Sequence, residues 1–539
     1  MIGPMRSATL TLFFALSSLA PAQEAASEPA RPNIVVILSD DHAQAAMGAY
    51  GSWLKELDPT PRLGALAAQG VLFENAFCTN SLCGPSRASF LTGKHSFVNG
   101  FTRNGDRFDG AQPTFPSMLQ GAGYTTAVIG KWHLCTDPVG FDHWQVLPGQ
   151  GDYYNPVLRG AEGKQQYPGH ASDVVTDLAI EWLDGERDPE QPFLLLAWHK
   201  APHRNWMPAP AELGHYQQTE VPVHPSLFDD YADNASPARY HRMGVDKDLH
   251  PHYDLFVPED EPCLGKDIKG TDQSGLRNLR AMNPEQRAVW DAAIAPNQKE
   301  LNGLEGRALV EAKHQRYVRQ YLETVRGMDR NVGRLLDHLD ATGLAENTLV
   351  IYASDQGFFL GEHGWYDKRW MYEESLRLPM VVRWPGHTEP GARAQQMVQN
   401  IDLAPTLLEA AGVAVPEDIH GRSMLPLLKG KRAADWRDAI YYHYYEYPGP
   451  HAVAPHRGIR TERHKLIQFY PFQEWELYDL QADPGEMRNL FGQPMQAGLT
   501  AELTLRLGEM AASFGEQVVM PPYSDELLQR FRPEGGDVR

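Results

Sequence analysis

The sequence predicts an α/β protein with a large, mostly parallel sheet flanked by helices, followed by a smaller α+β unit with an antiparallel sheet. Three observations support this prediction: four short apolar runs along the chain, helical stretches between them, and aromatic runs near the C-terminal end. The 539 residues exceed one ordinary domain, and an apolar content of 42% supplies enough material for a large core.

Each of the four apolar runs leads directly into polar, titratable side chains. The runs cover residues 33–39, 125–130, 193–198 and 348–354. Continuous aliphatic runs of this length suit strands buried on both faces of a parallel sheet. Ligand sites of open α/β sheets gather at the carboxyl ends of the strands. One such run would be an ordinary strand exit, but four of them predict a single active site.

The rest of the chain divides into recognisable segments. Residues 314–342 form the clearest helical stretch, and Gly343 suits its C-cap. Residues 208–306 are rich in Pro, Asp, His and Asn, which predicts an irregular insertion with some helix. We therefore predict a catalytic domain over 31–430. A C-terminal α+β subdomain over 431–539 follows, where short aromatic runs are typical of strands.

The N-terminus has the features of a secretory signal over residues 1–22. Arg6 supplies the positive flank, the following apolar run is too short to span a bilayer, and residues 20–22 offer a small-residue cleavage site. No second apolar run has membrane length. We expect a protein exported to the periplasm or secreted, without a membrane anchor.

Charge and cysteine content exclude several classes of protein. The formal net charge of −20, from 49 basic and 69 acidic residues, argues against binding nucleic acid or anionic membranes through the overall field. A polyanionic ligand would also be repelled, so its recognition requires a local cationic cluster. Four cysteines are too few for a disulfide framework in an exported protein of this size.

The most informative motif is Cys83-Gly84-Pro85-Ser86-Arg87, which continues as ASFLTG. Pro85 suits the first turn of a helix, so Cys83 lies near the positive end of a helix dipole, where a nucleophile or anion is favoured. A tyrosine-phosphatase loop is excluded because it needs five residues between Cys and Arg. Taken alone, Cys83 could equally be a structural turn cysteine before a helix.

A second group of residues offers oxygen ligands for a metal. Asp40 and Asp41 follow the first apolar run, and Asp355 and Gln356 follow the last. Hard cations prefer such ligands, so calcium, with magnesium as the alternative, fits better than zinc. Adjacent carboxylates repel each other, and a bound cation would relieve this. The alternative for Asp40 and Asp41 alone is a solvated strand exit.

Together these motifs resemble the type I sulfatases, which have an alkaline-phosphatase-like fold. The resemblance implies that a maturation enzyme oxidises Cys83 to formylglycine and that Asp40, Asp41, Asp355, Gln356 and residue 83 bind Ca²⁺. Gln356 departs from the asparagine common in the family. The stretches KWH, HKAPHRNW and WYDKRW supply the remaining family positions, which are Lys131, His133, His203 and Lys368.

In the mechanism that the resemblance implies, the formylglycine hydrate attacks sulfur. Arg87, Lys131 and Lys368 would neutralise negative charge. His203 would protonate the leaving oxygen, and His133 would take a proton from the second hydroxyl as sulfate departs.

The finer match is to bacterial N-acetylglucosamine-6-sulfatases that act in glycosaminoglycan degradation. It implies that Asp367, Arg369 and His456 bind sugar hydroxyls. The alternative is that Asp367 and Arg369 position Lys368 and that His456 is a loop residue.

Three further functions remain open. They are sulfatase action at another sugar position, phosphate or phosphonate ester hydrolysis within the same superfamily, and non-catalytic binding of sulfated glycans.

Overall fold

The protein is seen in a computed structural model that describes residues 1–3, 5, 9, 31–258, 270–294, 296, 300–429 and 435–516. Arg31–Arg539 group into one compact unit. Most of the predicted signal peptide lies outside the described residues, so that prediction stands untested.

The main sheet of the described chain has the strand order β13-β2-β12-β9-β1-β8-β4-β5-β6-β7. Its strands are β1 (Asn33–Ser39), β2 (Val71–Phe73), β4 (Thr125–Lys131), β5 (His143–Leu147), β6 (Val157–Gly160), β7 (Gly163–Gln166), β8 (Phe193–Trp198), β9 (Thr348–Ser354), β12 (Met380–Arg383) and β13 (Ala392–Ala394). The four predicted runs are β1, β4, β8 and β9. They are parallel neighbours at the centre of the sheet, which confirms the prediction.

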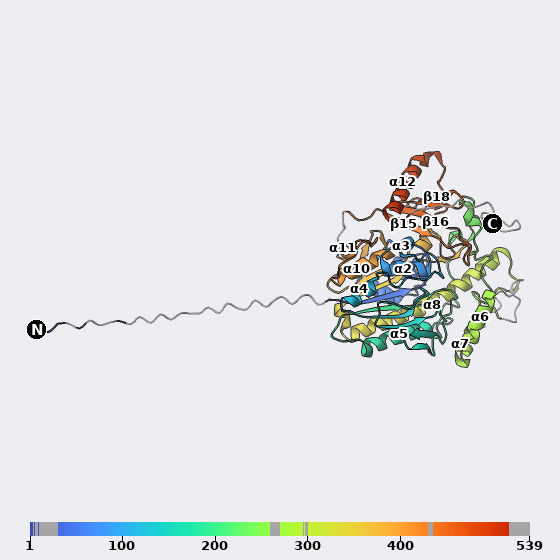
Figure 1. Cartoon of the computed structure of the whole chain (residues 1–539). Helices are drawn as coiled ribbons and strands as arrows, with labels where there is room; N and C mark the ends of the chain where they lie inside the picture. Colours follow the sequence, from blue (N-terminus) through green and yellow to red (C-terminus); the bar gives the residue numbers. More distant parts are fainter. Residues whose placement is uncertain are drawn as a thin grey trace. The chain divides into compact units, whose positions relative to one another are not determined.

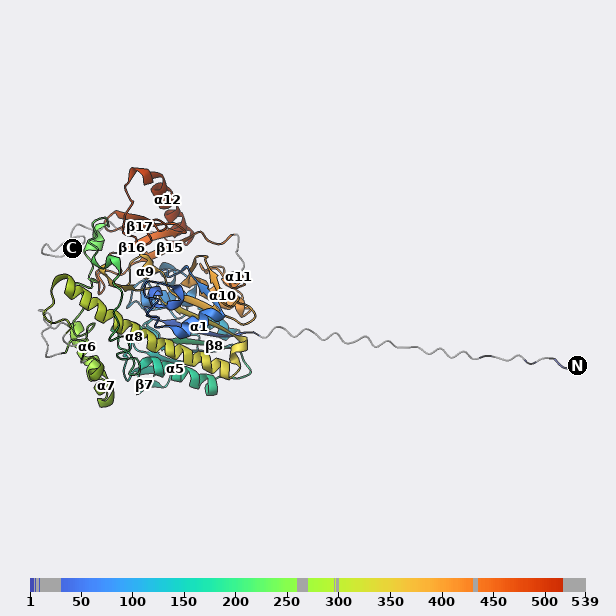
Figure 2. The same cartoon turned by 180° about the vertical axis from the view of Figure 1, so that it is seen from behind.

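Helices cover both faces of this sheet (Figures 1 and 2). On one side lie α2 (Cys83–Thr92), α4 (Phe115–Gly121) and α10 (Leu403–Ala410), and on the other α5 (Ala171–Glu181) and α8 (Gly306–Ala341). The remaining helices of the main unit are α1 (Pro61–Gln69), α3 (Ser96–Asn99), α9 (Glu373–Leu376) and α11 (Leu425–Leu428). None of the described helices is long and apolar enough to cross a membrane.

Helix α8 begins earlier than the sequence predicted. Its first residues, 306–308, are exposed, and Leu309, Val310 and Ala312 are only partly buried against the core, so the fully buried face starts at Lys313, close to the predicted start. Its end agrees with the prediction, since Gly343 adopts φ 73° just after the C-cap Thr342.

The predicted insertion contains the helices α6 (Gly270–Arg280) and α7 (Pro284–Ile294). The rest of its described chain is largely irregular. Two small two-stranded sheets lie outside the main sheet. One pairs β10 (Phe359–Leu360) with β11 (Tyr366–Asp367), and the other pairs β3 (Ala76–Phe77) with β14 (Val398–Gln399). The β10–β11 hairpin ends immediately before Lys368, so it positions that residue at the carboxyl end of β9.

The C-terminal part contains the expected antiparallel sheet. Its strands are β15 (Ala439–Tyr444), β16 (His456–Thr461), β17 (His464–Phe469) and β18 (Glu474–Asp479), in sequential order. Helix α12 (Ala497–Ser513) packs on one face through Leu503 and Leu507. On the other face Tyr442 joins the main core, so the two sheets share buried residues. The predicted boundary at 430/431 remains a prediction.

Candidate active site

The carboxyl ends of β1, β4, β8 and β9 bring the predicted catalytic and metal-binding residues together. Asp40 and Asp41 directly follow β1, and Asp355 and Gln356 directly follow β9. His203 lies in the turn after β8, and Lys131 and His133 lie at the end of β4, whose strand pairs with β8. Residues that are hundreds of positions apart therefore meet because their strands are neighbours in the sheet.

Cys83 is the first residue of α2 and is fully buried. Its Sγ lies 4.0 Å from Asp41 Oδ1 and 3.7 Å from Gln356 Nε2. Burial raises the pKa of the thiol to about 12, against the opposing charge of Lys368. An unmodified Cys83 is therefore a neutral thiol at neutral pH and a poor nucleophile.

Three of the predicted metal ligands, Asp40, Asp41 and Cys83, lie in one cluster that could hold a cation. One ligand atom from each of Asp40, Asp41, Cys83 and His203 lies within 4.8 Å of the others. Asp40 Oδ1 and Gln356 Oε1 are buried and receive no hydrogen bond from any described residue. Buried oxygens without donors are costly, and a hard divalent cation would satisfy them. The donor set thus fits calcium or magnesium.

Asp355 organises the centre through both of its carboxylate oxygens. Its Oδ1 accepts hydrogen bonds from the backbone N–H groups of Asp41 and Gln356, both at 3.1 Å. Its Oδ2 accepts from Arg87 Nε at 3.1 Å and from Arg87 Nη2 at 3.0 Å. Asp41 can turn its N–H inward because its φ is 69°, a left-handed conformation that aspartate tolerates.

Three buried cations each face an aspartate. Arg87 pairs with Asp355, Lys131 with Asp40, and Lys368 donates to Asp41 Oδ1 at 2.6 Å. Burial raises the pKa of Asp41 to about 6, although Lys368 opposes the shift. These ion pairs hold the three cationic side chains in place before substrate arrives. The same cations would then face the oxygens of a bound sulfate.

The two predicted catalytic histidines are held in different ways. His203 donates from Nδ1 to its neighbour's carbonyl, at Arg204, which leaves Nε2 facing Asp41 Oδ2 at 3.8 Å. His133 has a buried Nδ1 without a described hydrogen-bond partner. Burial, and then the nearby cations, hold the pKa of both well below the usual value, so both are neutral near pH 7. His199, in contrast, faces the α5 side, where Asp173 and His170 act on it.

The predicted sugar-binding residues separate into two groups. Arg369 forms an ion pair with Asp367, and His451 Nε2 lies 3.2 Å from Asp367 Oδ2. His456 instead packs among the rings of Trp370, Tyr442, Tyr444 and Phe469, and its Nδ1 bonds only Ala454 O. No hydrogen bond or ion pair among the described residues joins His456 to Asp367 or Arg369.

Sequence reasoning missed His451 and its partners. His451 and His456 stand in the same stretch, and only the fold shows that His451 contacts Asp367. Arg204 Nη1 lies 3.4 Å from His451 Nε2 and forms a bidentate pair with Asp254, both contacts at 2.6 Å. This network connects the His203 turn to the Lys368 loop, and its pairing could not be read from residue spacing.

Comparison with known proteins identifies the family. The model named Sulfatase matches residues 32–413, and the model described as N-sulphoglucosamine sulphohydrolase, C-terminal, matches residues 361–513. The chain belongs to the sulfatase family. This sulfatase is 46% identical over 520 residues to an N-acetylglucosamine-6-O-sulfatase of Bacteroides thetaiotaomicron, covering 94% of this chain and 92% of that protein. An ulvan-active sulfatase of Formosa agariphila is 26% identical, with 92% and 84% covered.

Solved structures agree with this assignment. A protein in complex with its substrate D-glucosamine-2-N,6-O-disulfate superposes with a TM-score of 0.86 at 44% identity, covering 92% of this chain and 100% of the other. The phosphonate monoester hydrolase of Silicibacter pomeroyi superposes with a TM-score of 0.65 at 21% identity, covering 89% and 95%. The second likeness concerns the fold alone. The chain is a sulfatase of alkaline-phosphatase-like fold, as the sequence predicted.

Proposed function

We propose that this sulfatase removes the 6-O-sulfate of N-acetylglucosamine in a glycosaminoglycan or another sulfated glycan. The observation that carries the proposal is the single buried cluster in which Cys83, unpartnered acidic and amide oxygens, and paired cations converge. The 46% identity to an N-acetylglucosamine-6-O-sulfatase supports the choice of sugar and position.

Asp40, Asp41, Asp355 and Gln356 would hold Ca²⁺, together with residue 83 after its conversion to formylglycine. When both are present, the cation and the hydrated aldehyde supply an activated hydroxyl nucleophile for attack on sulfur. Gln356 fits this role because its Oε1 has no described donor while its Nε2 is engaged by Asp41. The longer side chain therefore replaces the common asparagine without losing the ligand oxygen.

The side chains of this chain would perform the remaining steps. Arg87, Lys131 and Lys368 offset negative charge on the sulfate oxygens as the S–O bond breaks. A bound sulfate adds negative charge beside His203, which favours a proton at its Nε2 for transfer to the sugar oxygen. His133, neutral and buried, is able to accept the proton released when sulfate departs. Asp367 and Arg369, with His451 beside them, would bind sugar hydroxyls.

The test compares sulfate release from N-acetylglucosamine-6-sulfate with release from N-acetylgalactosamine-6-sulfate. The enzyme is first shown by mass spectrometry to carry the aldehyde at position 83. Release from the glucosamine compound alone supports the proposal. Release from neither would move the substrate to another sugar, position or chain length. Faster cleavage of an aryl phosphate than of an aryl sulfate would favour the phosphate or phosphonate alternative.

Calcium dependence requires a separate measurement. Chelation should abolish turnover, and Ca²⁺ should restore more of it than Mg²⁺, because the site offers several carboxylate and amide oxygens. Recovery with Zn²⁺ alone would contradict the proposed ion.

We also propose export to the periplasm or the medium after removal of residues 1–22. A formylglycine-generating enzyme in the producing cell would then modify Cys83. N-terminal sequencing of the exported protein tests the cleavage site.

A further inference from the structure

Lys200 is a buried cation at the catalytic centre without an acidic partner. It lies after β8 and is only 4% exposed. The cations Arg87, Lys131 and Lys368 each form an ion pair with an aspartate. No ion pair joins Lys200 to a carboxylate within the described part of the chain. Buried charges in proteins are normally paired, so Lys200 is available to an anionic group of a bound ligand.

The surroundings of Lys200 show which part of the site it faces. Its ammonium lies 4.5 Å from the centre of the Tyr153 ring, and the Tyr153 hydroxyl donates to His203 O at 2.7 Å. The backbone N–H of His203 donates to Lys200 O at 3.0 Å. Tyr153 thus contacts both Lys200 and His203, and the fields of Asp41 and Cys83 act on the Lys200 ammonium, so Lys200 lies beside the centre. If His203 protonates the leaving oxygen, Lys200 is on the side of the departing sugar.

Lys200 is charged under ordinary conditions. Burial lowers the pKa of its ammonium to about 8, and the fields of Asp152 and Asp41 limit the fall. Its charge is also one of those that lower the pKa of His133 and His203, after the larger effect of burial. The Tyr153 ring gives partial compensation, since a cation over an aromatic face gains less than a full ion pair.

We propose that Lys200 binds a second anionic group of the departing glycan, in addition to the sulfate ester that is cleaved. This rests on the proposed function. The group is a sulfamate on the C2 nitrogen or the carboxylate of an adjoining uronic acid, because both present delocalised negative charge to an ammonium. The substrate of the similar solved protein carries a 2-N-sulfate beside its 6-O-sulfate. A net charge of −20 makes such a local cation necessary for a doubly charged ligand.

The experiment uses the full, calcium-loaded chain with the aldehyde at position 83 verified by mass in every preparation. The variants are Lys200→Met, which removes the charge, and Lys200→Arg, which keeps it. Lys313→Met is the matched control, since Lys313 is also 4% exposed but bonds Asp246 O at 2.7 Å. Three substrates are compared: N-acetylglucosamine-6-sulfate, N-sulfoglucosamine-6-sulfate, and a disaccharide with N-acetylglucosamine-6-sulfate linked to a uronic acid.

We expect Lys200→Met to lower kcat/KM at least about tenfold on one of the doubly charged substrates. The loss on N-acetylglucosamine-6-sulfate should be clearly smaller, because there only the field of Lys200 at His133 and His203 is removed. Lys200→Arg should keep most of the wild-type kcat/KM on the doubly charged substrates. Lys313→Met should leave kcat/KM on all three substrates unchanged. A loss confined to the N-sulfo compound identifies the sulfamate, and one confined to the disaccharide identifies the carboxylate.

Two outcomes would overturn the inference while leaving the proposed function intact. One is an equal loss on all three substrates, which would assign Lys200 to the transferred sulfate or to folding. The other is no loss on any of them. If the wild type cleaves none of the three, the proposed function fails, and this inference fails with it.

Discussion

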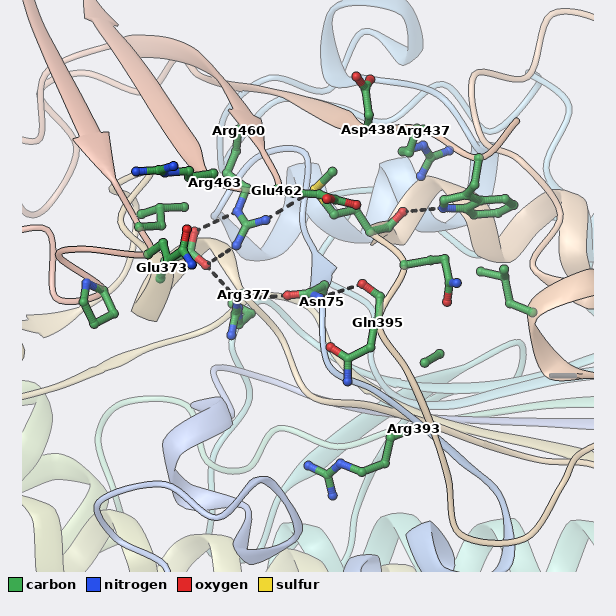
Figure 3. Close-up of a pocket in the computed structure, with 18 of the residues that line it drawn as sticks. Asn75, Glu373, Arg377, Arg393, Gln395, Arg437, Asp438, Arg460, Glu462 and Arg463 are labelled. Carbon is green, nitrogen blue, oxygen red and sulfur yellow. Dashed lines mark hydrogen bonds and ion pairs between the residues drawn. The ribbon is translucent and has the colours of Figure 1, made fainter. Parts of the chain in front are cut away.

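The catalytic centre and a second cavity of the described chain contain similar side chains but differ in how those side chains are partnered. The cavity, of about 1050 Å³, lies between the β13 edge of the main sheet and the C-terminal sheet (Figure 3). Both regions are rich in arginine and carboxylate. In the cavity each lining arginine already has an acidic partner, whereas the catalytic centre contains oxygens that no described donor reaches.

The pairing in the cavity is visible in Figure 3, where Arg377 and Arg460 converge on Glu373. The other lining arginines bind acids around the rim, as Arg463 does with Asp479 and Arg393 with Glu74. Such pairs leave little net charge for a ligand. Asp40 Oδ1 and Gln356 Oε1 in the smaller centre have no such partners. The cavity also has an unpartnered atom, Arg377 Nε, so what distinguishes the centre is that its unpartnered atoms are acidic and amide oxygens gathered beside Cys83.

The largest effect should come from removing the nucleophile. Cys83→Ala should reduce turnover at least about 10³-fold, to background, because Cys83 is the proposed source of the hydrated aldehyde. The buried site is small, so the thermal midpoint should change little. Kinetics on N-acetylglucosamine-6-sulfate and a melting curve test both points. Cys135→Ser, at an exposed cysteine, is the control and should retain activity. Residual turnover in Cys83→Ala would refute the assigned nucleophile.

The next effect tests whether the C-terminal sheet supports the centre. The Tyr442 hydroxyl accepts a hydrogen bond from Ser81 N at 3.2 Å and donates to Arg369 O at 2.6 Å. One side chain thus connects the segment before Cys83 to the loop of Lys368. Tyr442→Phe should lower kcat about fivefold to tenfold, in line with the loss of one or two hydrogen bonds that position reacting groups.

Tyr441→Phe is the matched control for that change. Tyr441 lies on the same strand but faces Glu516 and His443. Its substitution should lower the thermal midpoint without lowering kcat. If both variants lose stability and kcat to the same extent, Tyr442 acts only as a core residue and the comparison between the two variants fails.

The sequence predicted the centre well because strand ends impose proximity. Asp41 and Gln356 are far apart in the chain, yet β1 and β9 are parallel neighbours, so apolar runs ending in polar residues were sufficient to group them. The contact between Asp367 and His451 was not predictable, because it depends on how an irregular loop returns to the β10–β11 hairpin. Lys200 was missed for another reason: its significance is the lack of an acid beside it, and a sequence does not show which charges are paired.

A smaller effect concerns a buried acid outside the centre. Burial raises the pKa of Glu476 to about 7, while hydrogen bonds from Tyr372 and from Ala235 N, both at 2.7 Å, limit the rise. The folded state therefore binds the proton more tightly than the unfolded chain, and its stability falls as pH rises from about 4.5 to 7. Glu476→Gln should flatten this part of the curve of thermal midpoint against pH and leave kcat unchanged. A slope identical to that of the wild type would exclude Glu476 as its source.

The smallest effect should come from the arginine-lined cavity itself. Arg393 is half exposed and is paired with Glu74, and exposed pairs of this kind contribute about 0–1 kcal/mol. Arg393→Ala should therefore change the free energy of unfolding by less than about 1 kcal/mol and kcat/KM by less than about twofold. A larger fall in kcat/KM on a long sulfated chain, but not on the monosaccharide, would show that the cavity binds glycan. Arginines that form ion pairs within the protein would then still be able to recruit substrate. A binding site in this molecule would not need side chains that lack a partner.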